Sequence, residues 1–132
     1  MNSEQENIVS AVPEQEVVLH PQKSVIQYDD FARLDIRMGK ILEAIPVDGT
    51  DKLLKCTIDF GEFGLRTIVS GIREFRAPES LVGKMVPYIV NLAPKMIRGV
   101  ESQGMLLAMS VGTDALALLH PDCDVPPGTM IR

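Results

Sequence analysis

Two neighbouring stretches of the chain, 34–47 and 52–60, alternate apolar with polar residues. Successive side chains of a β-strand point to opposite faces, so a period of two predicts two strands that each bury one face. The second stretch alternates most clearly, because apolar residues occupy every second position from Leu54 to Phe60. Gly39 interrupts the first stretch, and we interpret it as the point where a barrel strand bends sharply.

Shorter apolar runs predict the remaining strands and their connections. A turn at 61–64 leads into a third strand, and an irregular or short helical connection at 72–84 is expected to cap one end of the sheet. Before the first strand, Asp29–Arg33 predicts one helical turn with an aspartate as its N-cap and Phe31 directed inward. The further strands are expected at 65–71, 85–91, 104–111 and 115–119, with a short closing strand at 129–131.

Together these elements predict an all-β domain over residues 28–132. Five main strands, one intervening cap and no strand–helix–strand rhythm favour a five-stranded OB-fold barrel with a short capping helix and a C-terminal extension. Residues 1–27 show neither strand nor helix periodicity and are rich in Glu, Gln and Ser, so we expect a flexible acidic leader or linker. The alternative is that apolar residues around 17–19 dock on the domain.

Residues 1–30 carry the whole net charge of −5. They hold one cation and six acids, so the 13 cations and 18 acids of the chain leave 12 of each for residues 31–132. A neutral domain binds nucleic acid only through a local patch, and its affinity is then modest and sensitive to salt. The chain has no apolar run near the roughly 20 residues of a membrane helix and its start is acidic, so we expect a cytoplasmic protein without membrane contact.

The sequence predicts no metal site, no cofactor and no catalytic residue. Its two cysteines, Cys56 and Cys123, are too few for a disulfide framework. His120 and Cys123 could form half of a zinc site, but the second pair of ligands is missing. No nucleophile motif surrounds Ser70 or Ser102, which ranks a hydrolytic enzyme last among the possible functions.

One stretch, residues 91–109, carries candidate binding chemistry. Its ends are apolar, while its middle is polar and broken by Pro94, Gly99 and Gly104, so we expect an ordered loop between two strands. Two cations, a hydroxyl and an amide on one loop suit a phosphate-rich ligand, because Lys and Arg supply charge while Ser and Gln supply hydrogen bonds. The alternative is an ordinary solvated loop.

Six separated segments carry motifs in a fixed order along the chain. They begin with Leu-Asp-Ile-Arg-Met-Gly-Lys-Ile at 34–41 and Asp-Lys-Leu-Leu-Lys at 51–55, and they end with Gly-Val-Glu-Ser-Gln-Gly-Met-Leu-Leu-Ala at 99–108. Between these lie 68–72, 78–84 and Asn91-Leu92 with Pro94. In this order the segments resemble the tRNA-binding OB-fold family, which forms the C-terminal part or β subunit of methionyl-tRNA synthetases and also free-standing tRNA-binding proteins.

The resemblance implies a tRNA-binding site in this chain. Its residues would be Asn91, Lys95, Arg98, Ser102 and Met105, flanked by Arg37, Lys52 and Lys55. Lys95 and Arg98 would neutralise phosphates, and Ser102 would donate to a phosphate or ribose oxygen. Asn91 would bond a base edge or brace the loop, and Met105 would either offer a soft surface to an unstacked base or fill the barrel.

The sequence departs from the family pattern at two places. A His-Pro pair is frequent before the Asp-Lys-Leu motif, but Ile45–Thr50 stands there in this chain. Ala93 occupies a position where the family commonly has a lysine. Both changes remove a polar or cationic group from the expected site.

The resemblance implies a sequence-nonspecific tRNA-binding module that raises the local tRNA concentration for an aminoacyl-tRNA synthetase, above all methionyl-tRNA synthetase. Only six residues are aromatic, so recognition of RNA shape and backbone fits better than base stacking. The implied partners are tRNA, a second copy of the chain bound through the C-terminal extension and the region before the first strand, and a catalytic synthetase chain. The alternative is a secretion-type chaperone of the same fold, which would bind proteins through apolar grooves.

Overall fold

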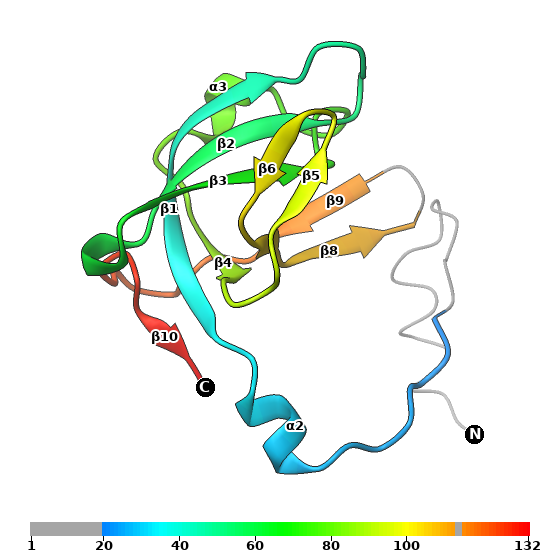
Figure 1. Ribbon diagram of the computed structural model, residues 1–132, viewed down its shortest axis with the longest axis vertical. Helices are drawn as coiled ribbons and strands as arrows, with labels where there is room; N and C mark the ends of the chain where they lie inside the picture. The colour runs from blue at the N-terminus through cyan, green and yellow to red at the C-terminus, as the bar shows by residue number, and fades with distance from the viewer. Residues whose placement is uncertain (1–19, 113–114) are drawn as a thin grey trace.

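The computed structural model of the chain describes residues 20–112 and 115–132. Its body is one strongly curled antiparallel sheet in the order β3-β2-β1-β4-β7, with β10 paired to β1 (Figure 1). The strands of this sheet are β1 (Ile36–Pro46), β2 (Leu54–Asp59), β3 (Leu65–Ser70), β4 (Met85–Ile89), β7 (Met105–Leu106) and β10 (Met130–Ile131). This arrangement confirms the prediction of an all-β, OB-type barrel with a short capping helix.

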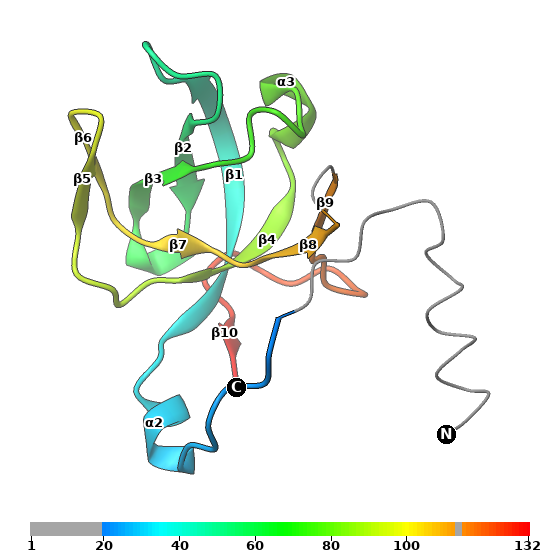
Figure 2. The same ribbon diagram turned by 90° about the vertical axis from the view of Figure 1, so that its right-hand side faces the viewer.

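Two hairpins and three short helical segments complete the described part of the chain. The hairpins lie on opposite sides of the sheet (Figure 2). One hairpin is formed by β5 (Lys95–Ile97) and β6 (Val100–Ser102), and the other by β8 (Ala108–Val111) and β9 (Ala115–Leu118). The helical segments are α2 (Tyr28–Ala32), the 3-10 turn η1 (Gly61–Phe63) and α3 (Pro78–Leu81).

Strand β1 is long because it pairs with two partners in succession. Its first half pairs with β4 and its second half with β2, and Lys40 lies opposite a residue of each. The register shifts between Ile41 and Glu43, so the irregularity lies just beyond the predicted bend at Gly39. Gly39 has a packing role as well, because an added Cβ would lie 2.7 Å from Cε1 of Phe60.

The core lies inside the curled sheet and is closed at one end by α3. Residues from β1 to β4 form its main cluster, with Leu81 of α3 and the flanking Phe60, Ile72 and Val90. The rings of Phe60 and Tyr88 meet edge to face at a centroid distance of 5.6 Å. Burial raises the pKa of the Cys56 thiol to about 11, so this cysteine stays neutral, as expected for a small buried hydrophobe. The alternation predicted for 52–60 is confirmed.

The predicted strand 104–111 is divided in the structure. Met105 and Leu106 pair with β4, whereas Ala108–Val111 pairs with β9 outside the main sheet. The N–H of Leu107 donates to the carbonyl of Pro87 in β4 at 3.0 Å, and the chain then leaves the main sheet. The predicted loop 91–109 is also more regular than expected, because β5 and β6 form a hairpin within it.

The helical turn predicted near residue 30 is present as α2, but its details differ. Gln27 is the N-cap, and Asp30 accepts a hydrogen bond from the backbone N–H of Gln27 at 3.0 Å. The prediction that Phe31 points inward is wrong, since Phe31 is 38% exposed and α2 contains no buried residue. The cause is the position of α2, which stands away from the barrel (Figure 1).

The predicted leader 1–27 lies mostly outside the described residues. Its described part, 20–27, is exposed and forms neither helix nor strand. The boundary at residue 28 stays a prediction. None of the helices in the described ranges is long and apolar enough to cross a membrane.

Candidate nucleic-acid interface

The hairpin β5–β6 presents an arginine at its tip. Ile97 pairs with Val100, so only Arg98 and Gly99 form the turn, and both have positive φ angles, 51° and 80°. Two successive positive φ values are the pattern of a type I′ turn, whose twist matches that of a hairpin. Arg98 is the one non-glycine residue of the described chain with a positive φ, and that conformation costs about 1–2 kcal/mol for a residue with a side chain. The turn therefore holds Arg98 in a locally strained conformation with its side chain exposed at the tip.

Side chains attach the base of the hairpin to β3. The hydroxyl of Ser102 accepts a hydrogen bond from the N–H of Val69 at 2.9 Å, and Oε1 of Gln103 accepts one from the N–H of Thr67 at 3.1 Å. The N–H of Gln103 donates to the carbonyl of Thr67 at 2.8 Å. Ser102 is only 4% exposed, so its hydroxyl positions the hairpin and does not face solvent as the predicted phosphate donor would.

Arg66 braces the same junction from β3. Its Nη1 donates to the carbonyls of Val90 and Gln103. These bonds link the end of β4, the base of the hairpin and the edge strand β3. Arg66 was not among the predicted site residues, because no sequence motif distinguishes a bracing arginine from an exposed one in a strand.

The turn between β1 and β2 is ordered by a second bracing arginine. Nη1 of Arg73 donates to the carbonyl of Thr50 at 2.7 Å, and the N–H of Arg73 donates to the carbonyl of Lys52 at 3.2 Å. The N–H of Lys52 donates to Oγ1 of Thr50 at 3.1 Å. The side chain of Lys52 is thus presented by a fixed turn. Arg73 was not predicted either, because an arginine in a connecting segment shows no sequence sign of bracing a distant turn.

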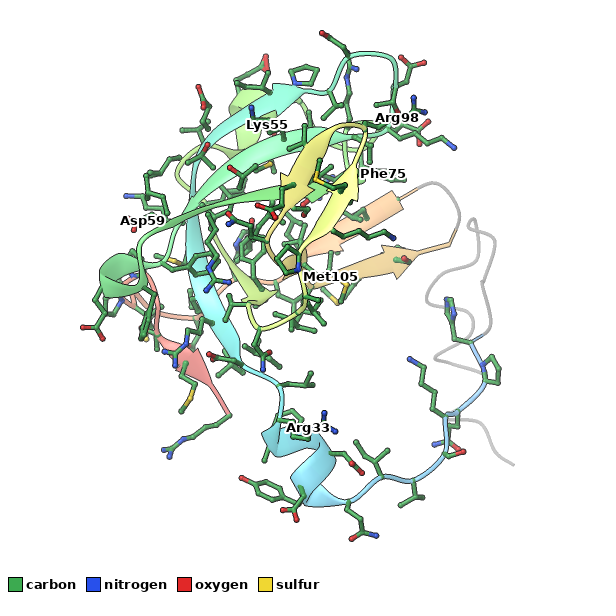
Figure 3. The ribbon with its side chains drawn as sticks, viewed as in Figure 1. Arg33, Lys55, Asp59, Phe75, Arg98 and Met105 are labelled. Atoms are coloured by element: carbon green, nitrogen blue, oxygen red, sulfur yellow. The ribbon has the colours of Figure 1, made fainter. Side chains whose placement is uncertain are left out.

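Four of the predicted cations gather around the hairpin: Lys52, Lys55, Lys95 and Arg98 are all exposed. Nη1 of Arg98 lies 3.8 Å from the position of a Cβ added to Gly49, so the hairpin tip reaches the turn before β2. Figure 3 shows Arg98 at the hairpin tip and Lys55 on β2, both in the upper half of the molecule. A groove of about 330 Å³ separates β2 and β3 from the hairpin, and it is lined by Lys55, Thr67, Gly99, Val100, Glu101 and Gln103.

Asn91 lies outside this group. Its Oδ1 accepts a hydrogen bond from the N–H of Asp35 at 2.8 Å, and its Nδ2 donates to the carbonyl of Arg33 at 2.7 Å. Both ends of the amide are used inside the chain. Of the two roles considered for Asn91, the bracing role is the one that this geometry supports.

Arg37 is also engaged within the chain. Its Nε forms an ion pair with Asp35 at 2.8 Å, and its Nη1 donates to the carbonyl of Gly128 at 3.0 Å. The guanidinium lies 4.2 Å from the ring centroid of Phe63. Arg37 therefore links β1 to the C-terminal segment and is not part of the exposed cationic group.

Met105 faces solvent beside the base of the hairpin. It is 46% exposed, so the alternative that it fills the barrel is wrong. In Figure 3 it lies at the end of the hairpin opposite to Arg98. The structure thus places an exposed, apolar and polarisable side chain beside the base of the hairpin, away from Arg98.

Known proteins share most of this chain, including the strands that carry the exposed cations. A family described as "Putative tRNA binding domain" matches residues 36–130, which extend from the first residue of β1 into β10. The chain is 48% identical over 112 residues to a methionine–tRNA ligase of Flavobacterium johnsoniae, covering 85% of this chain and 16% of the ligase. A methionine–tRNA ligase of Methanothrix thermoacetophila is 50% identical over 111 residues, covering 84% of this chain and 16% of the ligase. The chain thus spans about a sixth of the length of these relatives.

Solved structures of related proteins have the same fold as this chain. A MetRS-related protein from Pyrococcus horikoshii aligns with a TM-score of 0.78 at 35% identity, over 83% of this chain and 100% of that chain. The chaperone CsaA of Bacillus anthracis aligns with a TM-score of 0.75 at 29% identity, over 83% of this chain and 100% of that chain. From its sequence motifs, its barrel and these matches, the chain belongs to the tRNA-binding OB-fold domain family, whose members include part of methionyl-tRNA synthetases.

Proposed function

We propose that this chain is a sequence-nonspecific tRNA-binding module in the cytoplasm. It raises the local tRNA concentration for an aminoacyl-tRNA synthetase, above all methionyl-tRNA synthetase. The observation that carries the proposal is the group of exposed cations around the hairpin β5–β6, with Arg98 held at its tip. Lys95 and Arg98 contact phosphates from the hairpin, while Lys52 and Lys55 contact them from β2 and the turn before it. Charge on a preformed frame binds a phosphate backbone with little cost of ordering.

Recognition depends on backbone and shape. Among the described aromatic residues, Phe60 and Tyr88 are buried and Phe63 lies under Arg37. Tyr28 and Phe31 belong to α2, away from the hairpin. Phe75, labelled in Figure 3, is half-buried and does not line the groove. No described aromatic residue lines the groove beside the hairpin, so stacking of successive bases does not contribute there.

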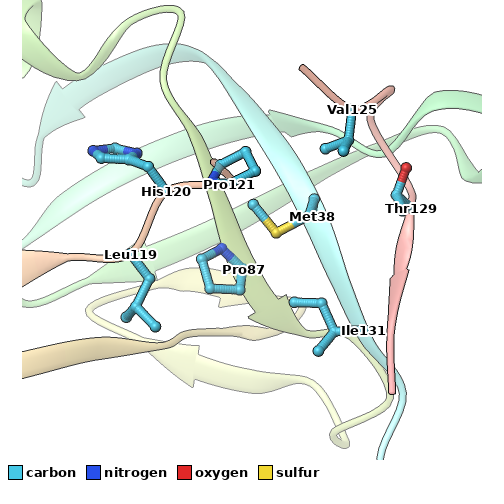
Figure 4. Close-up of a pocket in the computed structure, with 8 residues that line it drawn as sticks. All are labelled: Met38, Pro87, Leu119, His120, Pro121, Val125, Thr129 and Ile131. Carbon is cyan, nitrogen blue, oxygen red and sulfur yellow. The ribbon is translucent and has the colours of Figure 1, made fainter. Parts of the chain in front are cut away.

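A second copy of the chain is proposed as a partner at the opposite end of the molecule. Helix α2 exposes Tyr28 and Phe31, and β10 exposes Met130 and Ile131, although these are large apolar side chains. Between β1, β4, β10 and the C-terminal segment lies an apolar pocket of about 310 Å³ (Figure 4). Covering these surfaces with a second copy removes them from water, and the dimer then carries two tRNA sites. A catalytic synthetase chain, separate or fused, is the further partner.

The alternative function is a protein-binding chaperone of the same fold. Two observations support this alternative. One is the structural similarity to the chaperone CsaA, and the other is the apolar pocket of Figure 4. Apolar peptide binding persists or strengthens as salt rises, whereas phosphate binding weakens. The two functions therefore respond to salt in opposite directions.

The test is binding of mixed cellular tRNA across a salt series. In the variant carrying Lys95→Ala and Arg98→Ala, we expect the affinity to fall and the slope of log affinity against log salt to decrease by about one per cation removed. The control is a variant carrying Lys40→Ala and Lys84→Ala, which loses the same charge from β1 and the start of β4 and should bind like the native protein. Equal losses in both variants, or no tRNA binding by the native protein at low salt, would contradict the proposal.

A further inference from the structure

A second hollow lies beside the base of the hairpin and is separate from the groove that Lys55 lines. It measures about 280 Å³ and is formed by the end of β3 with residues 70–72, by Met105 and Leu106 of β7, and by part of β8–β9. None of its lining residues is a lysine or an arginine. The hollow therefore does not suit a phosphate, although it adjoins the proposed phosphate site.

The lining combines an apolar wall with hydroxyl groups. Val69, Ile72 and Leu106 provide apolar surface, whereas Ser70 and Ser110 carry the hydroxyls. Met105 stands at the hollow and is 46% exposed, so its thioether is available to a ligand. An apolar, polarisable surface with a few hydrogen-bonding groups suits a flat heteroaromatic ring.

Only one face of the hairpin β8–β9 contributes to the hollow. Ser110 lies opposite Leu116 in the register, and both line it. Met109 lies between Ala108 and Ser110 in β8, so its side chain points to the other face of the hairpin. This alternation supplies a matched control position one residue away from the hollow.

The hollow and the cations are close in the structure. Lys95 lies opposite Ser102 in the hairpin, and directly opposed residues are about 5 Å apart between Cα atoms. The hydroxyl of Ser102 is 2.9 Å from the N–H of Val69, which lines the hollow. A phosphate held by Lys95 would thus have its own or a neighbouring base within reach of the hollow.

We propose that this hollow receives one unpaired base of the bound tRNA. The inference rests on the proposed function, and it specifies which part of the RNA the chain recognises besides phosphates. Folded RNA offers unstacked bases in loops and at corners, whereas a perfect duplex does not. Because a hydroxyl both donates and accepts hydrogen bonds, the exposed Ser110 accommodates any base. The chain then distinguishes folded tRNA from duplex RNA without reading sequence.

The first test compares two RNA probes and two variants. Mixed tRNA and a blunt RNA duplex of similar length are titrated into the native protein, Ser110→Phe and Met109→Phe. The added ring of Ser110→Phe fills the hollow, so tRNA affinity should fall by about tenfold, towards that for the duplex, with an unchanged salt slope. Duplex binding should stay the same, and Met109→Phe should behave like the native protein. An equal loss for both probes, or no loss for tRNA, would overturn the inference.

The second test uses the native protein and does not depend on how a variant folds. Methyl groups of the methionines are labelled with carbon-13 and followed by NMR during titration. A base over Met105 shifts its methyl resonance upfield through the ring current with tRNA but not with duplex. Met130, exposed on β10, should not move in this way. Binding of both RNAs without a shift at Met105 would refute the base pocket alone, whereas binding of neither RNA would refute the proposed function.

Discussion

The hairpin end and the α2 end of the molecule expose opposite chemistry. Around β5–β6 four cations are exposed together with Met96 and Glu101, whereas α2 and β10 expose mainly large aromatic and aliphatic side chains. Each region contains an arginine from the family motifs, yet Arg98 is exposed at a strained turn, while Arg37 is paired with Asp35 and lies over Phe63. The same residue type is thus exposed and available to a ligand at one end, and is used to hold the fold together at the other. Its neighbours in space decide between the two roles.

The largest expected effect comes from the point where the hairpin joins the barrel. A Cβ added to Gly104 would lie 2.9 Å from Cδ1 of Ile68 and 3.0 Å from the carbonyl oxygen of Ile89, at a φ of 155°. We expect Gly104→Ala to lower the free energy of unfolding by about 2–3 kcal/mol and to weaken tRNA binding as the hairpin shifts. Gly99→Ala is the control for backbone strain without a clash, because its φ of 80° also disfavours a side chain but a Cβ there meets nothing within 4 Å. It should cost only about 1 kcal/mol. Urea denaturation measures both, and equal destabilisation would show that the junction is no tighter than the tip.

Removing Arg37 should affect stability but not binding. Arg37→Ala eliminates one ion pair, one hydrogen bond to a carbonyl and one contact with an aromatic ring, which together contribute about 2 kcal/mol. We expect a lower denaturation midpoint and an unchanged affinity for tRNA at temperatures where the variant is folded. A loss of affinity without a loss of stability would place Arg37 in the tRNA site and remove the contrast between the two ends.

Removing Arg98 should have the reverse effect. Arg98→Gly relieves a positive φ, so the free energy of unfolding should rise by up to about 1 kcal/mol. Affinity for tRNA should fall by about tenfold at low salt, because one phosphate contact is lost. Denaturation and filter binding of the same preparation give both values. Unchanged affinity would show that the tip does not contact RNA.

The smallest intrinsic effect is expected at α2. Phe31→Ser replaces an exposed aromatic side chain with a hydroxyl, so the stability of the single chain should change by less than about 0.5 kcal/mol. If a second copy covers α2, sedimentation should show a shift towards monomer at micromolar concentration. The affinity of each site for tRNA should stay the same. An unaltered oligomeric state would argue against α2 as the contact surface.

The regular parts of the fold were predictable because their signals are local. The alternation at 52–60 specifies which face of β2 is buried, and it is confirmed by Leu54, Cys56 and Ile58. The division of the strand 104–111 was not predictable, since it depends on β9 offering a partner to residues 108–111. The inward direction given to Phe31 failed because hydrophobicity alone does not tell whether a surface is covered by the same chain.

The exposed cations of the candidate site could be predicted from the sequence, but the hydrogen bonds that hold the site in place could not. Lys95 and Arg98 carry a visible signal, because cations stand on a glycine-broken stretch. From the sequence, Ser102 and Asn91 look equally suited to bind RNA. Their polar atoms are instead hydrogen-bonded to backbone groups that are 33 residues away in the sequence for Ser102, and 56 and 58 residues away for Asn91. Contacts over such separations leave no periodicity in the sequence.

The bonds that Ser102 and Gln103 make to β3 have a consequence for solubility. Strand β3 is the edge of the main sheet, and the N–H groups of Thr67 and Val69 would otherwise be free to pair with a strand of another molecule. The two side chains accept hydrogen bonds from these N–H groups, so a strand of another molecule cannot pair with them. Because the sheet never closes by a complete backbone ladder at this edge, these capped donors protect a concentrated solution of the protein from aggregating edge to edge.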